Sequence, residues 1–346
     1  MSSNVQFDQL GRDDQLYIVE AVARQSLPAW GLPTDSPMKL LSLSENATYR
    51  VDAPDRSEPL VLRVHRPGYH TRNAVETELA WMAALQKDMG IKTPQAIPTL
   101  EGQYVVSGGY RFGSETDERF VDLFEFIEGD APDESELLDP FQRLGRITAL
   151  LHLHARNWKR PAYFERLVWD YDGCLGSVSN WGNWRDAPGL GVDDISVLDQ
   201  AQATIQRRLQ DFGQGPDRFG LIHSDLRLAN LLETGKETRV IDFDDCGLGW
   251  FLYDLASALS FIETRPDVPE LVDAWLKGYR SVTDLSAEEE AEIPTFILLR
   301  RMTLLAWIGS HPTADMAVEQ GESFAADTVT LARNYLATLG ESTNTL

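Results

Sequence analysis

The sequence predicts an α+β fold of two lobes, in which a small lobe with a mainly antiparallel sheet precedes a larger and mainly helical lobe. Up to about residue 127, short runs of alternating apolar and polar residues dominate, as in half-buried strands. The acidic stretch EGDAPDESELLD (128–139) then changes the composition. Beyond it, apolar residues recur at helical spacing. We therefore expect an N-terminal lobe at 1–127 and a C-terminal lobe at 128–346.

Four stretches predict the strands of the first lobe. MKLLSLSENATYRVD (38–52) is typical of a strand, a short turn and a second strand, and LVLRVH (60–65) of a further strand. QYVVSG (103–108) and RFVDLFEFIEG (119–129) complete the set, with a polar hairpin loop expected around GSETDE (113–118). Together they favour a sheet of sequential, antiparallel strands.

One helix is predicted between these strands. Thr71 or Asn73 can cap its N-terminus, and Gly90 suits its C-terminal end. The apolar residues between them recur three or four positions apart, as on one face of a helix: Val75, Leu79, Met82 and Leu85. This face would pack on the sheet.

The second lobe is predicted to consist mostly of helices. Asp139 and Pro140 are typical of a helix start, and a further helix is expected from Ile195 to Phe212. Ser286 and Glu289 form a capping box before a long helix that includes ILLRRMTLLAWIG.

Residues 221–245 depart from the helical pattern. LIH and TRVIDF read as short strands that flank NLLETGKE, with Gly235 at the turn between them. We therefore expect a β-hairpin within the helical lobe, and this hairpin carries a cluster of acidic and amide side chains.

Composition restricts the class of protein. Lys and Arg number 31 against 54 Asp and Glu, a net charge of −23, which argues against a nucleic-acid partner and either favours a cationic ligand or keeps the protein in solution. The two cysteines, Cys174 and Cys246, form no disulfide framework or zinc motif, as expected in a reducing cytoplasm. No apolar run approaches the ~20 residues of a membrane helix, and the N-terminus lacks a signal-peptide pattern.

Asp225, Asn230 and Asp242 form the chemical core of the sequence. Phosphoryl transfer from ATP needs positioning, magnesium and an aligner for the attacking hydroxyl rather than covalent help from the protein. A carboxylate and an amide oxygen are suitable magnesium ligands, and Asp242 and Asn230 supply them if their strands are neighbours. Asp225, on the preceding turn, could accept the hydroxyl proton. Taken singly, Asp225 and Asn230 could equally bind the backbone of a turn.

The ordered set H-x-D-x-x-x-x-N followed by V-I-D-F carries kinase-type mechanics. HSDLRLANLL…VIDFDD resembles the aminoglycoside phosphotransferase and choline kinase superfamily, and LVLRVHRPGYH…ELAWMAAL adds to the likeness. Within that superfamily the chain is similar to the branch with type II homoserine kinase, hydroxylysine kinase and a bacterial stress-response Ser/Thr kinase. The resemblance implies a bilobal, protein-kinase-like fold, with ATP and Mg²⁺ as cofactors.

The resemblance also implies roles for single residues. Asp225 would be the catalytic base, and Asn230 and Asp242 would hold magnesium. Arg63 would bind phosphate and pair with Glu78, although Arg63 could instead face solvent and Glu76 is a rival partner. Further nucleotide contacts are expected from a polar loop over the phosphates and from the adenine hinge: Ser44, Asn46 and Thr48, then Glu125 and Ile127.

Residues outside the motif point to the acceptor and to the support of the turn. Five aromatic residues lie close to carboxylates, a combination that attracts ammonium groups, although the same rings could simply pack a core: Trp169, Tyr171, Trp181, Trp184 and Trp250. The resemblance implies that Asp254 braces the catalytic turn. His223 is expected to brace it as well, and His152 to pack rather than bind metal.

The sequence thus predicts a cytoplasmic kinase that uses ATP and magnesium to phosphorylate a hydroxyl of a small, amine-bearing molecule. Two alternatives stay open. One is a bacterial Ser/Thr protein kinase of the stress-response type, and the other is a nucleotide-binding regulatory pseudokinase. The intact Asp–Asn–Asp set argues against the pseudokinase, because a binding protein does not require Asp225.

Overall fold

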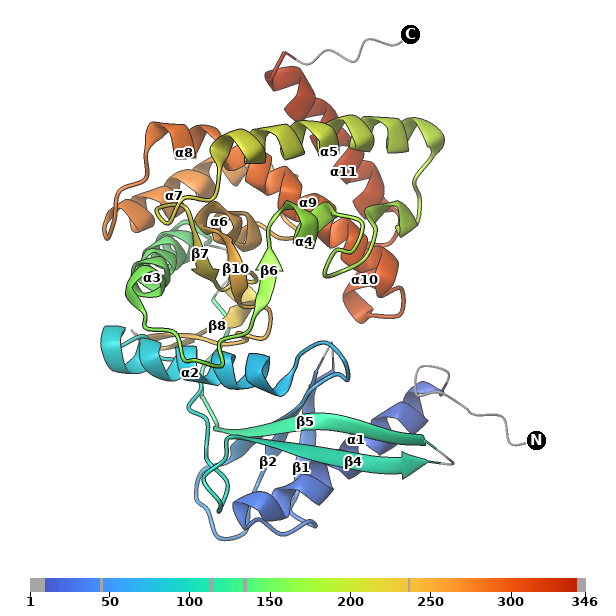
Figure 1. Cartoon of the computed structure of the whole chain (residues 1–346), viewed down its shortest axis with the longest axis vertical. Coiled ribbons are helices and arrows are strands. Elements are labelled where there is room, and N and C mark those ends of the chain that lie inside the picture. Colours follow the sequence, from blue (N-terminus) through green and yellow to red (C-terminus); the bar gives the residue numbers. More distant parts are fainter. Residues whose placement is uncertain (1–9, 44–45, 113–114, 133–135, 236, 341–346) are drawn as a thin grey trace, which may run out of the picture. The chain divides into compact units, whose positions relative to one another are not determined.

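The structure is a computed structural model that describes residues 10–43, 46–112, 115–132, 136–235 and 237–340. The chain forms two compact units (Figure 1). The first unit comprises residues 1–129 together with 160–165, and the second comprises 130–159 and 166–346. The return of 160–165 to the first unit is a feature that the sequence analysis did not foresee.

The first unit is built on a five-stranded sheet in the order β1-β2-β3-β5-β4. All neighbouring strands in this sheet are antiparallel. Its strands are β1 (Met38–Leu43), β2 (Ala47–Val51), β3 (Leu60–Val64), β4 (Val105–Phe112) and β5 (Glu115–Glu125). The hairpin predicted around 113–118 is present, since β4 and β5 are antiparallel neighbours, but its loop is shorter than predicted. β5 begins at Glu115 and pairs with β4 as far as Asp122, so residues 115–118 start a strand rather than belong to a loop.

Helices α1 (Arg12–Ser26) and α2 (Arg72–Met89) complete the first unit with the short 3₁₀ segment η2 (Leu27–Trp30). Thr71 caps α2, since its hydroxyl accepts a hydrogen bond from the Ala74 amide at 3.1 Å. Gly90 ends α2 at a φ of 68°, a left-handed conformation that glycine adopts at little cost. Both predicted ends of this helix are confirmed. Val22 of α1 packs with apolar residues of the sheet in one buried cluster.

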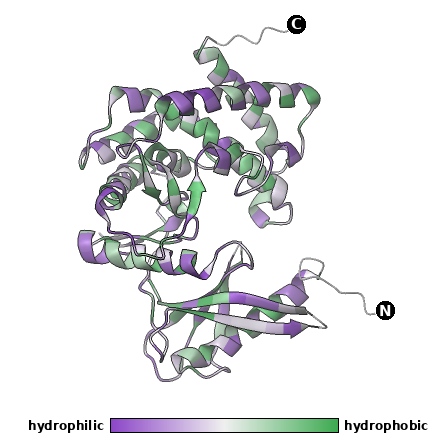
Figure 2. Cartoon of the chain, in the orientation of Figure 1, coloured by the Kyte–Doolittle hydropathy of each residue, from purple (hydrophilic) through white to green (hydrophobic). Residues whose placement is uncertain are grey.

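The second unit is mainly helical (Figure 1). Its helices are α3 (Leu138–Asn157), α4 (Tyr171–Leu175), α5 (Val192–Phe212), α6 (Phe251–Ala258), α7 (Val268–Arg280), α8 (Ala287–Ala291), α9 (Ile293–Ser310), α10 (Asp315–Gln320) and α11 (Ser323–Thr338). The 3₁₀ segments η3 (Trp184–Asp186) and η4 (Leu228–Asn230) are added to these. Polar residues recur along α5, whereas α9 is coloured mostly as hydrophobic (Figure 2). Most residues of α9 are buried, which makes it the central helix of this unit.

The capping box at Ser286 and Glu289 is present but caps a shorter helix than predicted. It begins α8, which ends at Ala291, and α9 starts separately at Ile293. Pro294 lies at the start of α9, where its missing N–H costs nothing. In one continuous helix Pro294 could not donate to the Glu290 carbonyl and its ring would clash with it, so the helix is interrupted at Glu292.

Five short strands lie in the second unit. β6 (Leu167–Trp169), β10 (Gly247–Trp250) and β7 (Phe219–Ile222) form one sheet in that order, and β8 (Leu231–Thr234) and β9 (Glu237–Val240) form a separate hairpin. The predicted hairpin between LIH and TRVIDF is therefore misassigned, because β7 pairs with β10 and only β8 pairs with β9. Gly235 does lie at the turn, with a φ of 63°.

None of the helices in the described ranges is long and apolar enough to cross a membrane.

Helices α3 and α7 touch through their backbones. A methyl group at Gly145 of α3 would lie 2.0 Å from the Trp275 carbonyl oxygen, and one at Gly278 of α7 would lie 1.9 Å from the Gln142 carbonyl oxygen. Neither carbonyl can move without shifting a helix. These two glycines therefore set how closely the helices approach.

We expect Gly145→Ala to lower the free energy of unfolding by about 3 kcal/mol, because overpacking here forces two backbones apart. Urea denaturation followed by circular dichroism measures this. Gly11→Ala is the control, since no atom of the described residues beyond its chain neighbours lies within 4 Å of the added methyl group, and it should change stability by less than about 1 kcal/mol. Equal effects of the two substitutions would contradict this account of the contact.

Candidate functional site

Asp254 of α6 holds the turn that follows β7. Its buried carboxylate accepts hydrogen bonds from the amides of His223 at 3.1 Å and Ser224 at 2.6 Å. Ser224 has a φ of 72°, which is unfavourable for a residue with a side chain. The two hydrogen bonds hold this backbone in place, so the expected bracing role of Asp254 agrees with the geometry. The helix that carries it begins at Phe251.

Two histidines support the same turn. His152 of α3 is buried and lies 2.9 Å from the Asp254 carboxylate and 3.0 Å from the Tyr279 hydroxyl, and burial lowers its pKa, so it packs as a neutral ring. The His223 ring donates from Nε2 to the Ile241 carbonyl at 3.2 Å and accepts the Asp225 amide at Nδ1. His223 thus ties the turn to the segment that leads to Asp242.

Each oxygen of the Asp225 carboxylate has its own donor. Oδ1 accepts a hydrogen bond from Nη2 of Arg300 at 2.7 Å, and Oδ2 accepts one from Nδ2 of Asn230 at 2.8 Å. The Arg227 side chain lies 3.4 Å from Oδ2. Burial alone would raise the pKa of Asp225, but the guanidinium groups of Arg227 and Arg300 outweigh it and hold this pKa below its ordinary value. The carboxylate is therefore ionised near neutral pH and fixed in orientation.

The β8–β9 hairpin brings Asn230 and Asp242 to one end. Leu231 pairs with Val240 in the last register position, and the Ile241 amide donates to the Asn230 carbonyl at 3.0 Å just beyond it. Asp242 follows with a φ of 62° and is exposed. The two residues lie twelve positions apart in the sequence and meet because the hairpin closes between them.

The amide group of Asn230 can be oriented from its neighbours. Its nitrogen lies 2.7 Å from the Asp225 carbonyl oxygen and 2.8 Å from Oδ2 of the same residue, and both of these atoms only accept hydrogen bonds. The side-chain oxygen of Asn230, Oδ1, must therefore be directed away from Asp225. This leaves it able to act as a metal ligand beside the Asp242 carboxylate.

This donor set fits magnesium. Among the described residues, no group of three or more His, Cys, Asp or Glu could hold a metal ion. An amide oxygen and a carboxylate suffice for magnesium when phosphate oxygens and water complete its octahedral shell. The arrangement is thus suited to a metal that arrives with a nucleotide.

In the first unit, Arg63 is paired with two carboxylates. Its Nη1 lies 2.8 Å from Glu78 of α2, and its Nη2 lies 2.7 Å from Asp122 of β5. Arg63 and Asp122 are directly opposite in the β3–β5 register. Arg63 is buried, so it does not face solvent, and the rival Glu76 lies instead near Arg72 at 3.7 Å.

Asp122 was missed by the sequence analysis. It is fully buried and also lies 3.1 Å from Nε2 of His65. Burial would raise its pKa, but Arg63 and His65 lower it below the ordinary value. The signal in the sequence was an aspartate among the apolar residues of a predicted strand. That signal indicates an ion pair only once the β3–β5 register, which places Asp122 opposite Arg63, is known.

The remaining predicted nucleotide contacts are placed as follows. Asn46 is buried and its side-chain oxygen accepts the Arg66 amide at 3.0 Å, and Thr48 lies opposite Arg63 on β2. Ser44 lies outside the described residues. Glu125 ends β5 with its amide donating to the Gln95 carbonyl at 3.0 Å, and Ile127 follows in an irregular, half-buried stretch.

Four of the five aromatic residues singled out in the sequence belong to the core of the second unit, whereas Tyr171 is half-buried. Trp169, Trp181, Trp184 and Trp250 are all buried. The Trp169 ring stacks on Tyr253 and meets Trp181 edge-on. The Trp181 ring already faces the Arg300 guanidinium at 5.0 Å. The packing alternative for these rings is therefore correct, and they do not form an open cage for ammonium groups.

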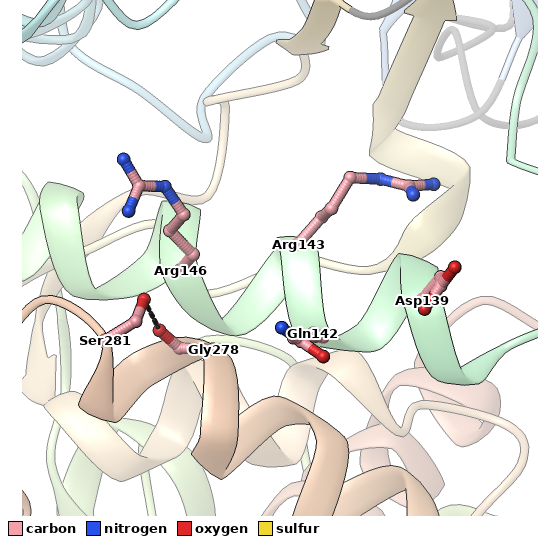
Figure 3. A pocket seen from close by; sticks show the side chains of 6 residues that line it. All are labelled: Asp139, Gln142, Arg143, Arg146, Gly278 and Ser281. Carbon is pink, nitrogen blue, oxygen red and sulfur yellow. Dashed lines mark hydrogen bonds between the residues drawn. The ribbon is translucent and has the colours of Figure 1, made fainter.

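A cavity of about 150 Å³ between α3 and α7 lies apart from these groups. In Figure 3, Arg143 and Arg146 extend from α3, and the Ser281 hydroxyl donates to the Gly278 carbonyl on α7. Arg143 is also paired with Glu233 at 2.6 Å. None of the predicted catalytic, metal or nucleotide residues lines this cavity.

Comparisons with known proteins point in one direction. Residues 38–291 match the phosphotransferase enzyme family. The chain is 25% identical over 302 residues to amicoumacin kinase of Bacillus subtilis (strain 168), covering 84% of each chain. It is 41% identical over 159 residues to homoserine kinase of Neisseria meningitidis serogroup B, covering 44% of this chain and 47% of that protein. A solved structure of a microcompartment-associated aminopropanol kinase is 44% identical with a TM-score of 0.84, over 93% of this chain and 98% of the other.

The buried carboxylate of Asp122 gives a pH-dependent prediction. Asp122→Asn should lower the free energy of unfolding at pH 7 by about 3 kcal/mol, since it removes one partner of a buried charge cluster. Because the folded-state pKa is lowered, the wild-type carboxylate stabilises the fold above the unfolded pKa of about 3.9 and loses this effect as pH falls through the folded pKa. The difference in the free energy of unfolding between wild type and Asp122→Asn should therefore become smaller below about pH 4.

Urea unfolding at pH 7, 5 and 3.5 measures this gap. Glu76→Gln serves as the control on the same unit, because its ion pair with Arg72 is half-exposed and should contribute less than about 1 kcal/mol. A gap that stays constant over this range would show that the Asp122 charge is not what stabilises the cluster.

Proposed function

Because this chain belongs to the phosphotransferase enzyme family and is a kinase of that family, we propose that it transfers the γ-phosphoryl group of ATP to the hydroxyl of a small amino alcohol, in a magnesium-dependent reaction. Membership confirms the predicted superfamily, and the solved relatives confirm the predicted protein-kinase-like α+β fold. The observation that carries the proposal is the Asp225–Asn230 hydrogen bond at the end of a hairpin that also presents Asp242.

In the proposed reaction, Asp225 accepts a hydrogen bond from the acceptor hydroxyl. This bond orients the hydroxyl oxygen toward the γ-phosphorus. A bond forms between that oxygen and phosphorus while the bond to the β-phosphate oxygen breaks, and ADP leaves with the bonding electrons. The hydroxyl proton passes to the Asp225 carboxylate. Because the pKa of this carboxyl is low, the proton moves late, when the hydroxyl oxygen has become acidic by bonding to phosphorus.

Asn230 and Asp242 would hold magnesium, which neutralises charge on the phosphates when it is bound. The orientation of the Asn230 amide supports this, since one side chain can donate to Asp225 and present its oxygen to a metal at the same time. The same residue would thereby couple the position of the base to the position of the metal.

Arg63 would bind phosphate, with Glu78 as its partner. A phosphate group would compete with Glu78 and Asp122 for the guanidinium, since both carboxylates already contact it. Two carboxylates around one guanidinium leave a formal charge of −1. Phosphate would therefore bind Arg63 by displacing one of these carboxylates from it. Asn46 and Thr48 belong to the neighbouring loop and strand that would cover the phosphates. Ser44 would belong to the same loop, and Glu125 and Ile127 would form the adenine hinge.

The acceptor class is supported by the relatives. Aminopropanol kinase, with 44% identity over nearly the full chain, is named for an amino alcohol. The many carboxylates of the chain suit a cationic molecule. A cytoplasmic location is also proposed, since both cysteines are free, buried thiols, as is usual in a reducing compartment.

An assay of ADP release with magnesium-ATP tests the proposal. The acceptor pool contains 1-aminopropan-2-ol, homoserine, ethanolamine, choline and an aminoglycoside. Strong stimulation by 1-aminopropan-2-ol alone would identify an amino-alcohol kinase. Stimulation by none of them, together with tight ATP binding in calorimetry, would contradict the small-molecule proposal and favour the protein-kinase alternative.

Asp225→Ala should reduce acceptor-dependent turnover by at least about 10³-fold, the upper range for loss of a positioned acid–base group. ATP affinity should change little, because Asp225 acts on the acceptor hydroxyl. Asp267→Ala is the control, since this half-exposed aspartate pairs locally with Arg265 and should leave turnover unchanged. Near-normal turnover in the Asp225 variant would rule out its assignment as the base.

A further inference from the structure

Arg300 is a charged residue in the middle of the buried helix α9. It is 1% exposed, and the residues around it in this helix are almost all apolar. Burying an arginine is costly unless its charge and its N–H groups find partners. The partners of Arg300 therefore indicate what the helix gains from carrying it.

Two of those partners, Ser224 and Asp225, lie in the turn that follows β7, which is the catalytic turn of the proposed function. Nη2 donates to Oδ1 of Asp225 at 2.7 Å, and Nη1 donates to the Ser224 carbonyl at 3.1 Å. Nε donates to the Ser260 hydroxyl at 3.1 Å. The rings of Trp181 and Tyr253 lie 5.0 and 5.5 Å from the guanidinium carbon. The side chain is thus fixed by hydrogen bonds along its edge and by aromatic rings.

We propose that Arg300 is the positioning residue for Asp225, and that it selects the acceptor hydroxyl over the acceptor ammonium as the group that meets this carboxylate. This inference rests on the proposed kinase function. Arg300 binds Oδ1 of Asp225, whereas Asn230 binds Oδ2 and Arg227 lies 3.4 Å from Oδ2, so rotation of the carboxylate would break the Arg300 and Asn230 hydrogen bonds.

Arg300 also joins two segments of unusual backbone. Ser224 has a φ of 72° and Phe261 a φ of 71°, and both are residues with side chains in the left-handed region. Arg300 donates to Ser224 itself and to Ser260, the neighbour of Phe261. Such conformations persist only where the surrounding contacts determine them fully. Arg300 supplies one contact to each.

The selection between hydroxyl and ammonium follows from charge. An amino alcohol offers two groups to a carboxylate, and an unpaired carboxylate attracts the ammonium more strongly than the hydroxyl. Such a complex would place nitrogen where oxygen must react. Arg300 pairs with Oδ1 of Asp225 at 2.7 Å, which is closer than the 3.4 Å between Arg227 and Oδ2. With Arg300 bound, the ammonium therefore gains little at this carboxylate and the hydroxyl can occupy the position.

Arg301 provides a matched control on the same helix. It is 2% exposed, and its Nη1 pairs with the buried Glu263 at 2.6 Å. Its other hydrogen bonds go to Thr328 and to the Phe324 carbonyl. It thus equals Arg300 in burial and ion pairing, and none of these partners belongs to the catalytic turn.

The test compares Arg300→Gln with Arg301→Gln in full-length protein, using ATP and 1-aminopropan-2-ol. We expect kcat of Arg300→Gln to fall on the order of 10²-fold, as for a misplaced catalytic group, with KM for ATP within about 3-fold of wild type. Arg301→Gln should keep kcat within about 3-fold even if it lowers Tm equally. Equal losses of kcat in the two variants would overturn the positioning role.

Arg300→Lys keeps the charge but replaces the planar fork with a point charge. Its kcat should lie between those of wild type and Arg300→Gln, and a kcat equal to wild type would overturn the role of the fork. This variant also decides the question if Arg300→Gln does not fold. Propan-1-amine, which has no hydroxyl, should inhibit Arg300→Gln on the order of tenfold more strongly than wild type or Arg301→Gln. Unchanged inhibition would overturn the selection of hydroxyl over ammonium.

A second readout needs no acceptor. In protein labelled with ¹³C at aspartate carboxyl carbons, the Asp225 signal is assigned from its loss in Asp225→Asn, and its chemical shift is compared between variants at pH 7. The shift should change in Arg300→Gln, which loses the hydrogen bond to Oδ1, and stay unchanged in Arg301→Gln. An unchanged shift in Arg300→Gln overturns the pairing. If wild type phosphorylates none of the offered acceptors, the proposed function fails while this comparison still decides the role of Arg300.

Discussion

The second unit depends on one buried carboxylate, that of Asp254. It accepts hydrogen bonds from the amides of His223 and Ser224 and from the His152 ring, so it satisfies three donors at once. Without it, the buried amides of His223 and Ser224 would lose their acceptor, and nothing would hold Ser224 in its left-handed conformation. The position of Asp225, the next residue, therefore depends on this carboxylate. The hairpin then returns the chain to the same place, where Ile241 hydrogen-bonds Asn230 and His223 contacts Ile241.

Both units bury a guanidinium among groups from distant parts of the chain. In the first, Arg63 of β3 joins α2 to β5 through Glu78 and Asp122. In the second, Arg300 of α9 joins the turn after β7 to the turn after α6. A guanidinium suits this task because it stays charged and donates in several directions within one plane. Each buried guanidinium therefore links two elements through ion pairs and hydrogen bonds. Removing one partner leaves the charge of the other uncompensated.

Local signals predicted local structure well. The Thr71 cap, the Gly90 end, the glycine turn at Gly235 and the Ser286 capping box each depend on residues within a few positions, and each is present. The predicted pairing of β7 was wrong, since β7 pairs with β10. The sequence of one strand does not specify which other strand it pairs with. Asp122 was missed for the same reason, since only the β3–β5 register places it opposite Arg63.

The sequence around Arg300 indicated an unusual buried charge but not its partner. Two arginines inside ILLRRMTLLAWIG are unusual, because arginine is almost never fully buried unless it is paired. The pattern could have indicated a buried ion pair. It could not have named Asp225, which lies 75 positions earlier. The motif around Asp225 was readable because it is contiguous, whereas its support comes from helices far along the chain.

The return of residues 160–165 to the first unit bears on how the chain folds as it is synthesised. These residues follow the twenty-residue helix α3 of the second unit, and the Glu165 amide donates to the Thr77 hydroxyl of α2 at 3.2 Å. A ribosome that has made residue 129 has thus not yet made all of the first unit. The first unit can be completed only after α3 has emerged, so its last contacts form while the second unit is already under way. A single cut after Gly129 would likewise leave six residues of the first unit on the other fragment.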